Sequence, residues 1–340
     1  MKALIYEGPK QVAVRDIPKP VPQEGQALIR VDFCGICGSD IGIFSGTHPR
    51  AKAPLVMGHE FVGVVEEIRG EANGFRAGEK VVPYPLLSCG HCFACRNGRE
   101  HVCDSLRIIG IDLDGGAAEY VCCQTDVLYR VPEQVSGKVA GITEPLAVAV
   151  HTLHRAGFRP MDRILIQGAG PIGTLVGTVA KHSGAARIII SDFDETRLAV
   201  SRKLGFETVN AGRENLTEYV RRATNGDGAD IVFECTGAES AALEMTGPCR
   251  TDGMICLVGV HKAPRPVALA DMHFRELNLT ATRVYTKRDF EQAVELTRHI
   301  SDDLEEIISH VVPLSDCANV FDLIHDPKET TAKVMVDCRR

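Results

Sequence analysis

The feature that most constrains the fold is a glycine-rich turn between an apolar run and a helical pattern. The apolar run covers residues 163–167, the turn G-A-G-P-I-G covers 168–173, and the helical pattern extends from about 171 to 182. Glycines at these spacings permit a tight turn, let the backbone approach a pyrophosphate and allow close packing of helix on strand. The N–H groups at the start of such a helix are free to bind phosphate. The segment therefore predicts a dinucleotide site on a parallel sheet, formed by Gly168, Gly170, Pro171, Ile172 and Gly173.

Asp192 ends the next predicted strand, nineteen residues after Gly173. A carboxylate at this position can accept hydrogen bonds from both ribose hydroxyls and would repel a 2′-phosphate, so NAD is favoured over NADP. NADP remains an alternative cofactor, because Arg197 could pair with its 2′-phosphate. Asp192 could instead cap the following helix, although Asp194 is the better candidate for that cap.

The chain changes character twice. Before about residue 144, short β-rich segments alternate with Gly and Pro, which predicts an irregular, partly barrel-like β domain. From residue 163, apolar strands alternate with helices, which predicts a doubly wound parallel sheet. The last ~55 residues are too few for a separate domain. We therefore expect an α/β protein in which a Rossmann domain, 146–285, is inserted into a β-rich domain made of 1–145 and 286–340.

Composition excludes several classes of protein. The 340 residues are 44% apolar and 24% charged, as in an average globular protein, and the net charge of −7 comes without a dense basic run. We therefore expect neither a nucleic acid nor a membrane as partner. No apolar stretch approaches the ~20 residues of a membrane helix, and the N-terminus does not resemble a signal sequence. These features predict a cytoplasmic protein.

Four of the thirteen cysteines are clustered: Cys89, Cys92, Cys95 and Cys103. Disulfide frameworks are typical of small secreted domains, which this chain is not. Four thiolates on a short loop suit a closed, tetrahedral zinc site. An iron–sulfur cluster is the alternative, since it also takes four thiolates, and unligated surface thiols are a third possibility.

A second set of candidate metal ligands is dispersed along the chain. It comprises Cys37, His59, Glu60 and Glu144. Each has an ordinary explanation alone: a buried thiol, a hydrogen-bonded loop histidine, or a carboxylate at a helix N-terminus. Together, beside a dinucleotide turn, they predict catalytic zinc, which keeps three protein ligands and one exchangeable position.

These motifs resemble those of the zinc-dependent medium-chain alcohol dehydrogenases, and more closely those of their sorbitol and sugar dehydrogenase branch. The motifs that carry the resemblance, over essentially the whole chain, lie at 37–40, 58–63, 89–103, 114–120, 144–146 and 168–173. The resemblance implies a GroES-like catalytic domain around the inserted Rossmann domain, two zinc ions per chain (one catalytic and one structural), NAD, and a homodimer or homotetramer.

The resemblance also implies roles for individual residues. Cys37 and His59 resemble ligands of the catalytic zinc, with Glu60 and Glu144 alternating as the carboxylate ligand. Asp40 resembles the carboxylate that orients His59, and Ser39 the hydroxyl that takes the proton of the substrate alcohol. Val258 and Gly259 resemble the strand end beside the nicotinamide, and Arg283 resembles an arginine that faces the substrate; a surface or interface position is its alternative.

The chain departs from this branch at two positions near the first motif. Many relatives have a histidine where Gly42 lies, so water, the ribose hydroxyls or another residue, such as His48, must complete the proton path. Many sorbitol dehydrogenases have a tyrosine where Ile43 lies, which argues against sorbitol itself. Arg283 can bind hydroxyls, and it binds carboxylate or phosphate more strongly.

The resulting hypothesis is an NAD-dependent zinc dehydrogenase that oxidises a secondary hydroxyl of a polyol, sugar or sugar acid to a ketone. One alternative is an amino-alcohol dehydrogenase of the L-threonine type. The other is a non-catalytic protein that senses NAD or zinc, which would not need to keep an open metal site.

Overall fold

The computed structural model describes residues 1–326 and 329–340, which divide into two compact units. One unit consists of Met1–Glu144 and Thr286–Arg340, and the other of Pro145–Tyr285. The first boundary falls inside helix α4 (Thr143–Ala156), one residue before the boundary expected from the sequence. Within the described residues, no helix is both long enough and apolar enough to cross a membrane.

The second unit is built on a six-stranded sheet in which every pair of neighbours is parallel, with the order β13-β12-β11-β14-β15-β16. This confirms the parallel sheet predicted from the turn. The order reverses between β11 and β14, which is where open parallel sheets bind their ligands. The strands are β11 (Arg163–Gln167), β12 (Arg187–Asp192), β13 (Glu207–Asn210), β14 (Ala229–Glu234), β15 (Cys249–Leu257) and β16 (Asn278–Ala281).

The helices of this unit begin where their sequence signals predict. Helix α5 begins at Pro171, the position that proline favours, and helix α6 is capped by Asp194, whose side chain accepts a hydrogen bond from Thr196 N. The cap is therefore Asp194 and not Asp192. The helices that follow α4 are α5 (Pro171–His182), α6 (Glu195–Lys203), α7 (Leu216–Ala223), α8 (Glu239–Glu244) and α9 (Leu269–Phe274).

The first unit is β-rich and irregular. Its largest sheet has the order β10-β6-β5-β3-β18-β17, with β9 also paired to β3; a three-stranded sheet (β2-β1-β4) and a two-stranded one (β7-β8) complete it. The strands are β1 (Lys2–Gly8), β2 (Gln11–Asp16), β3 (Gln26–Gly35), β4 (Leu55–Val56), β5 (Glu60–Arg69), β6 (Lys80–Pro83), β7 (Leu86–Leu87), β8 (Arg107–Ile108), β9 (Tyr120–Gln124), β10 (Leu128–Arg130), β17 (Ile308–Pro313) and β18 (Lys333–Asp337). The helices are α1 (Gly38–Phe44), α2 (Phe93–Arg96), α3 (Gly137–Ala140), α10 (Lys287–Leu296), α11 (Ser301–Ile307) and α12 (Val320–His325), with short 3-10 turns η1 (Glu100–Val102), η2 (Thr125–Val127) and η3 (Leu314–Asn319).

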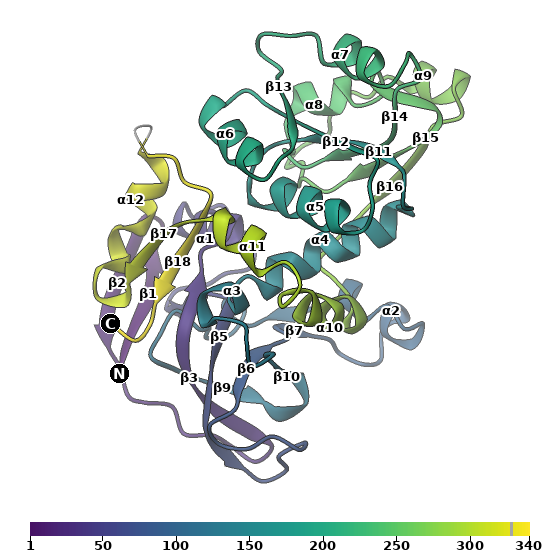
Figure 1. Cartoon of the computed structure of the whole chain (residues 1–340). Helices are drawn as coiled ribbons and strands as arrows, with labels where there is room; N and C mark the ends of the chain where they lie inside the picture. The colour runs from purple at the N-terminus through teal and green to yellow at the C-terminus, as the bar shows by residue number, and fades with distance from the viewer. Residues whose placement is uncertain (327–328) are drawn as a thin grey trace. The chain divides into compact units, whose positions relative to one another are not determined.

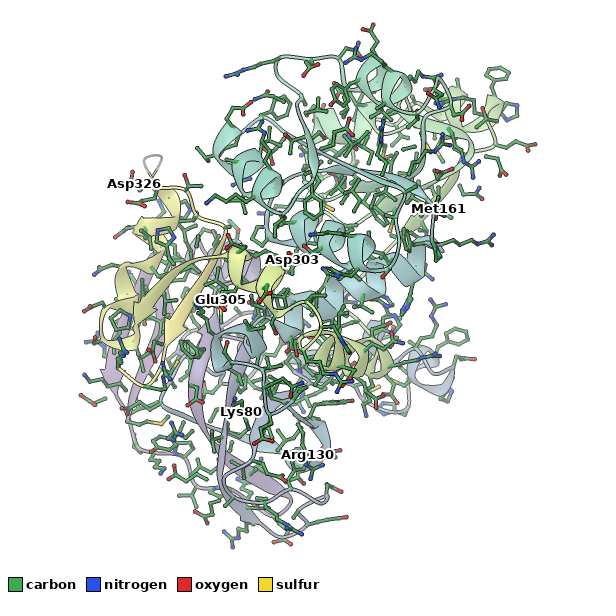
Figure 2. The ribbon with its side chains drawn as sticks, in the orientation of Figure 1. Lys80, Arg130, Met161, Asp303, Glu305 and Asp326 are labelled. Atoms are coloured by element: carbon green, nitrogen blue, oxygen red, sulfur yellow. The ribbon has the colours of Figure 1, made fainter. Side chains whose placement is uncertain are left out.

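The C-terminal segment supplies a central strand of the largest sheet. Strand β18 pairs with β3 antiparallel and with β17 parallel, so chain ends far apart in sequence lie side by side (purple and yellow in Figure 1). Glu305 of α11, labelled in Figure 2, forms an ion pair with Lys138 of α3. The last residues of the chain are therefore integral to the unit that holds Cys37 and His59.

Candidate active site

Three of the four dispersed ligand candidates lie together in the first unit. Ligand atoms of Cys37, His59 and Glu60 all lie within 4.8 Å of one another. Cys37 is the N-cap of α1, and Glu60 begins β5 directly after His59. His59 and Glu60 are 4% and 1% exposed, so water cannot satisfy their polar atoms as it would at the surface.

Three buried atoms of this site lack a hydrogen-bond partner among the described residues: Oε2 of Glu60, which is ion-paired with Lys333, Nδ1 of His59 and Oδ1 of Asp40. The last two atoms lie 4.0 Å apart. The other oxygen of Asp40 accepts a hydrogen bond from Cys37 N at 2.8 Å, which fixes the carboxylate in place. A proton on Nδ1 facing Asp40 leaves Nε2 of His59 available to a metal ion. The donor set, one thiol, one imidazole and carboxylates, fits zinc.

Acidic groups dominate the electrostatics of the site. Burial alone lowers the pKa of His59, but Cys37, Asp40 and Glu144 outweigh it and raise the pKa well above its ordinary value. Burial raises the pKa of Asp40. Glu144, in the first turn of α4, is not among the three residues that form the 4.8 Å cluster, although its charge reaches His59. A site with this excess of acids is suited to a cation.

Lys333, which the sequence analysis did not identify, is the cation already at this site. It begins β18, its ammonium contacts the Glu60 carboxylate, and it donates to Ile36 O at 2.9 Å. Burial lowers its pKa, but Glu60, Cys37 and Glu144 raise the pKa above its ordinary value. No local motif marks Lys333, and only the pairing of β18 with β3 brings it to Glu60.

Ser39 and His48 are the candidates for moving the substrate's proton. Ser39 Oγ lies 3.5 Å from His59 Nε2. A Cβ added at Gly42 would lie 3.9 Å from His48 Cβ, so His48 borders the space left by the missing histidine. However, His48 Nδ1 accepts hydrogen bonds from the N–H groups of Arg50 and Ala51. Burial and, to a smaller extent, the positive charge of Arg50 lower the pKa of His48. His48 is therefore held as a neutral imidazole.

The four clustered cysteines converge on one point. Their sulfur atoms all lie within 4.8 Å of one another, with 3.5 Å between Cys92 and Cys95 and 4.0 Å between Cys89 and Cys95. Tetrahedral zinc with Zn–S bonds of about 2.3 Å separates its sulfurs by about 3.8 Å. A four-iron cluster attaches each thiolate to a different iron and a two-iron cluster attaches the thiolates in pairs, whereas a single ion accounts for four sulfur atoms this close together. Backbone N–H groups of His91 and Cys92 lower the pKa of Cys89 to about 6, which favours the thiolate that binds metal.

In the second unit, the glycine turn leaves no room for a side chain at Gly173. A Cβ at Gly173 would lie 2.0 Å from Gly168 O, so only glycine permits this close approach. Asp192 Oδ2 accepts a hydrogen bond from Ala169 N at 2.8 Å, which fixes the carboxylate beside the turn. Gly168, Asp192 and Phe193 line one pocket of this unit. Arg197 pairs instead with Asp194, at 3.9 Å, and its side chain is 52% exposed.

The end of β15 is held by Glu234 at the end of β14. The N–H groups of Val258 and Gly259 both donate to Glu234 O, at 2.8 and 2.7 Å. The buried side chain of Glu234 accepts hydrogen bonds from Thr236 N and Gly237 N and lies 2.9 Å from His261 Nε2. The sequence analysis did not identify Glu234 or His261, because a lone Glu in an apolar strand carries no motif.

Arg283 lies just after β16 and is exposed. The next residue, Val284, has a φ of 42°, a left-handed conformation that is rare for a β-branched residue. The chain is therefore sharply redirected after Arg283, where it leaves the parallel sheet.

Known proteins match this chain over nearly its whole length. The alcohol dehydrogenase GroES-like domain matches residues 23–133, and the zinc-binding dehydrogenase family matches residues 171–299. A 2-dehydro-3-deoxy-L-galactonate 5-dehydrogenase of Pseudoalteromonas atlantica is 36% identical over 339 residues, covering 99% of each chain. An L-threonine 3-dehydrogenase of Anaeromyxobacter dehalogenans is 30% identical over 345 residues, covering 99% of each chain.

Solved structures share the fold. A structure assigned as a zinc-binding dehydrogenase of Sinorhizobium meliloti 1021, bound to NADP, has a TM-score of 0.92 and 27% identity over 99% of this chain and 98% of its own. A protein of Escherichia coli CFT073 named a short chain alcohol dehydrogenase, in complex with NADH, has a TM-score of 0.89 and 27% identity over 99% of both chains. These matches confirm the GroES-like and Rossmann-like fold, and with the two relatives they show that the chain belongs to the zinc-binding alcohol dehydrogenase family of oxidoreductases.

Proposed function

We propose that this protein is an NAD-dependent zinc dehydrogenase that oxidises the secondary hydroxyl of a sugar acid to a ketone by hydride transfer. Polyols and neutral sugars are the related substrates. The observation that carries the proposal is the cluster of half-buried Cys37 with buried His59 and Glu60, whose donor atoms lie within 4.8 Å of one another. The relative named for a sugar acid, at 36% identity, supports this substrate class.

Residues of the first unit would hold both metal ions. Cys37 and His59, with Glu60 or Glu144 as carboxylate, would bind the catalytic zinc, and Cys89, Cys92, Cys95 and Cys103 the structural one. A catalytic zinc ion supplies Lewis acidity, which lowers the pKa of the substrate hydroxyl toward neutrality. Asp40 keeps His59 in the tautomer that presents Nε2, because its fixed carboxylate faces Nδ1. Ser39 would relay the hydroxyl proton: its Oγ, which lies beside His59 Nε2, accepts that proton and passes its own to water or a ribose hydroxyl.

Residues of the second unit would hold the dinucleotide. The N–H groups at the start of α5 would bind its pyrophosphate, where Gly168, Gly170, Pro171, Ile172 and Gly173 leave the backbone accessible. Asp192 would accept hydrogen bonds from the ribose hydroxyls, and the backbone of Val258 and Gly259 would border the nicotinamide. The pairing of Arg197 with Asp194 supports NAD over NADP, because this arginine is already engaged by a carboxylate.

Arg283 would bind the carboxylate of the substrate through its forked N–H donors. Its exposure after β16 is compatible with this role and equally with a surface role. Relatives named L-threonine 3-dehydrogenase are 30–32% identical to this chain. For this reason, L-threonine is included among the substrates to be tested. We further propose a cytoplasmic location, because none of the thirteen cysteines forms a disulfide, as is typical of a reducing compartment. The family resemblance supports a homodimer or homotetramer.

The test is NADH formation by the zinc-loaded protein with sugar acids, polyols, sugar phosphates and L-threonine. We expect an acidic sugar substrate, no turnover with Cys37→Ser, and a KM raised about 10–100-fold in Arg283→Ala, the range for losing a charged hydrogen bond. Arg222→Ala is the matched control, since this arginine is 70% exposed on α7 of the same unit. Turnover of neutral polyols alone, or of L-threonine alone, would reject the sugar-acid assignment. No turnover with any substrate in a protein that binds zinc and NAD would reject the dehydrogenase chemistry.

A further inference from the structure

Lys333 is fixed against the candidate catalytic metal site by three independent features. Its side chain is 3% exposed, its ammonium contacts Glu60, and it donates to Ile36 O, one residue before Cys37. The hydrogen bond from Ile36 N to Val334 O, at 2.9 Å, ties the same two segments through the backbone. A lysine is rarely buried without function or partner, and here the partner is a candidate metal ligand.

The fold also reserves space for this ion pair. A Cβ at Gly35 would lie 2.3 Å from Glu60 Oε2 and 2.9 Å from Lys333 Cε. Gly35 pairs with Met335 across β3 and β18. The register of these strands therefore places the Glu60–Lys333 ion pair next to a residue that has no side chain. The Glu60–Lys333 contact is therefore a built feature of the sheet, and an alanine at position 35 would displace it.

The formal charges of the metal site indicate what the Glu60–Lys333 ion pair does. Zinc bound by the Cys37 thiolate and one carboxylate is formally neutral, and a second bound carboxylate makes the centre anionic, which opposes ionisation of a substrate hydroxyl. Asp40 faces His59 and is not a candidate metal ligand, although its charge also reaches Glu60 and Lys333. With Lys333 included, zinc, Cys37, Glu60 and Glu144 sum to zero whether or not Glu60 binds the metal. When Glu60 is not bound to the metal, its buried carboxylate remains paired with Lys333.

We propose that Lys333 is a positioning residue that competes with the catalytic metal for Glu60, and so keeps one coordination position open to an incoming ligand. This rests on the proposed zinc site. It makes Glu144 the steady carboxylate ligand and Glu60 the exchangeable one. Lys333 acts through Glu60 and has no direct part in hydride transfer.

The experiment measures access to the metal without any substrate. Both zinc ions are replaced by Co2+, and imidazole is titrated while the visible absorption of the metal is recorded. In Lys333→Met, Glu60 has no partner except the metal and closes the open position, so the Kd for imidazole rises about tenfold, the scale of effects from groups that orient metal ligands. In the double variant Lys333→Met/Glu60→Gln, the competing carboxylate is gone and the Kd returns to that of the unmodified protein.

Controls separate this role from a structural one. Lys80→Met removes a lysine from β6 of the same sheet, whose ammonium donates to Val135 O at 2.9 Å (Lys80 in Figure 2), and leaves the Kd unchanged. If Lys333→Met does not fold, the double variant, which buries no lone charge, is compared with Glu60→Gln: equal Kd values support the inference. An unchanged Kd in Lys333→Met, or a rise that persists in the double variant, overturns it. If the unmodified protein binds Co2+ only at the four cysteines, the proposed zinc site fails and this inference fails with it.

Discussion

Asp192 is held by its backbone surroundings in a way that fixes the direction of its carboxylate. Oδ2 accepts from Ala169 N and Oδ1 accepts from Asp194 N, at 2.8 and 3.0 Å, and each oxygen keeps a second lone pair. The carboxylate is therefore oriented before any cofactor binds, and its selectivity needs no rearrangement. This is a property of one residue and can be tested at one residue.

We expect Asp192→Ala to raise the KM for NAD about 10–100-fold, because hydrogen bonds from the ribose hydroxyls to a charged acceptor are lost. The KM for NADP should fall or stay constant, since the repulsion of a 2′-phosphate is removed. Steady-state kinetics with both cofactors measures this change. Asp252→Asn, at an exposed position of β15, is the control. Equal losses for NAD and NADP would contradict the role of the carboxylate.

Residues with local motifs could be predicted from the sequence, and residues without them could not. The fold prediction is confirmed, and the structure brings Cys37, His59 and Glu60 together. Lys333 was missed because it lies 297 positions from Ile36, the carbonyl that it binds, and a single lysine in a β-rich segment is ordinary. Long-range pairing of strands, not local pattern, decides its environment.

At the scale of elements, Asp230 joins three strands of the parallel sheet. It precedes the apolar stretch of β14 and accepts hydrogen bonds from Arg163 Nε of β11 and Arg250 Nε of β15, at 2.9 and 2.7 Å. Burial raises the pKa of Asp230, but these hydrogen bonds outweigh it and lower the pKa to about 2. Since the folded pKa lies below the unfolded value of about 3.9, the stabilisation is complete above pH 5 and is lost as the pH falls from 4 to 2.

We expect Asp230→Asn to destabilise the second unit by about 1 kcal/mol at pH 7, after allowance for solvent screening, and by about half as much at pH 3. Urea denaturation followed by hydrogen exchange of β11 and β14 amides measures this difference. Asp227→Asn is the matched control, because Asp227 pairs with the same Arg163 but its side chain is 63% exposed. A destabilisation that does not depend on pH would show that the charge of Asp230 is not its cause.

The four-cysteine loop is the second element whose stability can be tested directly. We expect Cys89→Ser to lower the zinc content from two ions to one per chain, because a closed site that loses a thiolate binds weakly. Proteolysis within residues 89–103 should become faster, since α2 there is one short turn with an exposed Phe93. Metal analysis and limited proteolysis check both effects. Cys122→Ser, which alters a half-buried thiol outside the cluster, should retain two zinc ions.

Element boundaries show what local pattern can predict. Helix α5 begins at Pro171 and β12 ends at Asp192, as the turn and the apolar run predict. Strand β15 instead begins at Cys249, five residues before its apolar run starts at Met254, because it pairs with β14 from Ala229 and continues past a break in register. A pairing partner extends a strand where the strand's own sequence does not require it.

At the scale of the whole molecule, the proposed ligands divide between the two units, with zinc in the first and NAD in the second. We expect saturating NAD to slow hydrogen exchange of core amides in the second unit about 100-fold at 100 times its Kd, since binding stabilises the folded form by mass action. A zinc chelator should accelerate exchange around residues 37–60 and 89–103 of the first unit and leave β11–β16 unchanged. Exchange measured by mass spectrometry resolves the two units. Acceleration of both units by the chelator alone would contradict this division.

The pairing of β18 with β3 has a consequence for biosynthesis. A growing chain leaves the ribosome from its N-terminus, so every strand of the parallel sheet is available before β17 and β18 are made. The sheet beside Cys37 instead stays open along the edge of β3 until residue 337 has emerged. Glu60 likewise has no counter-charge until residue 333 is synthesised. The second unit can therefore fold during translation, whereas the metal-binding unit must wait until β18 has been synthesised.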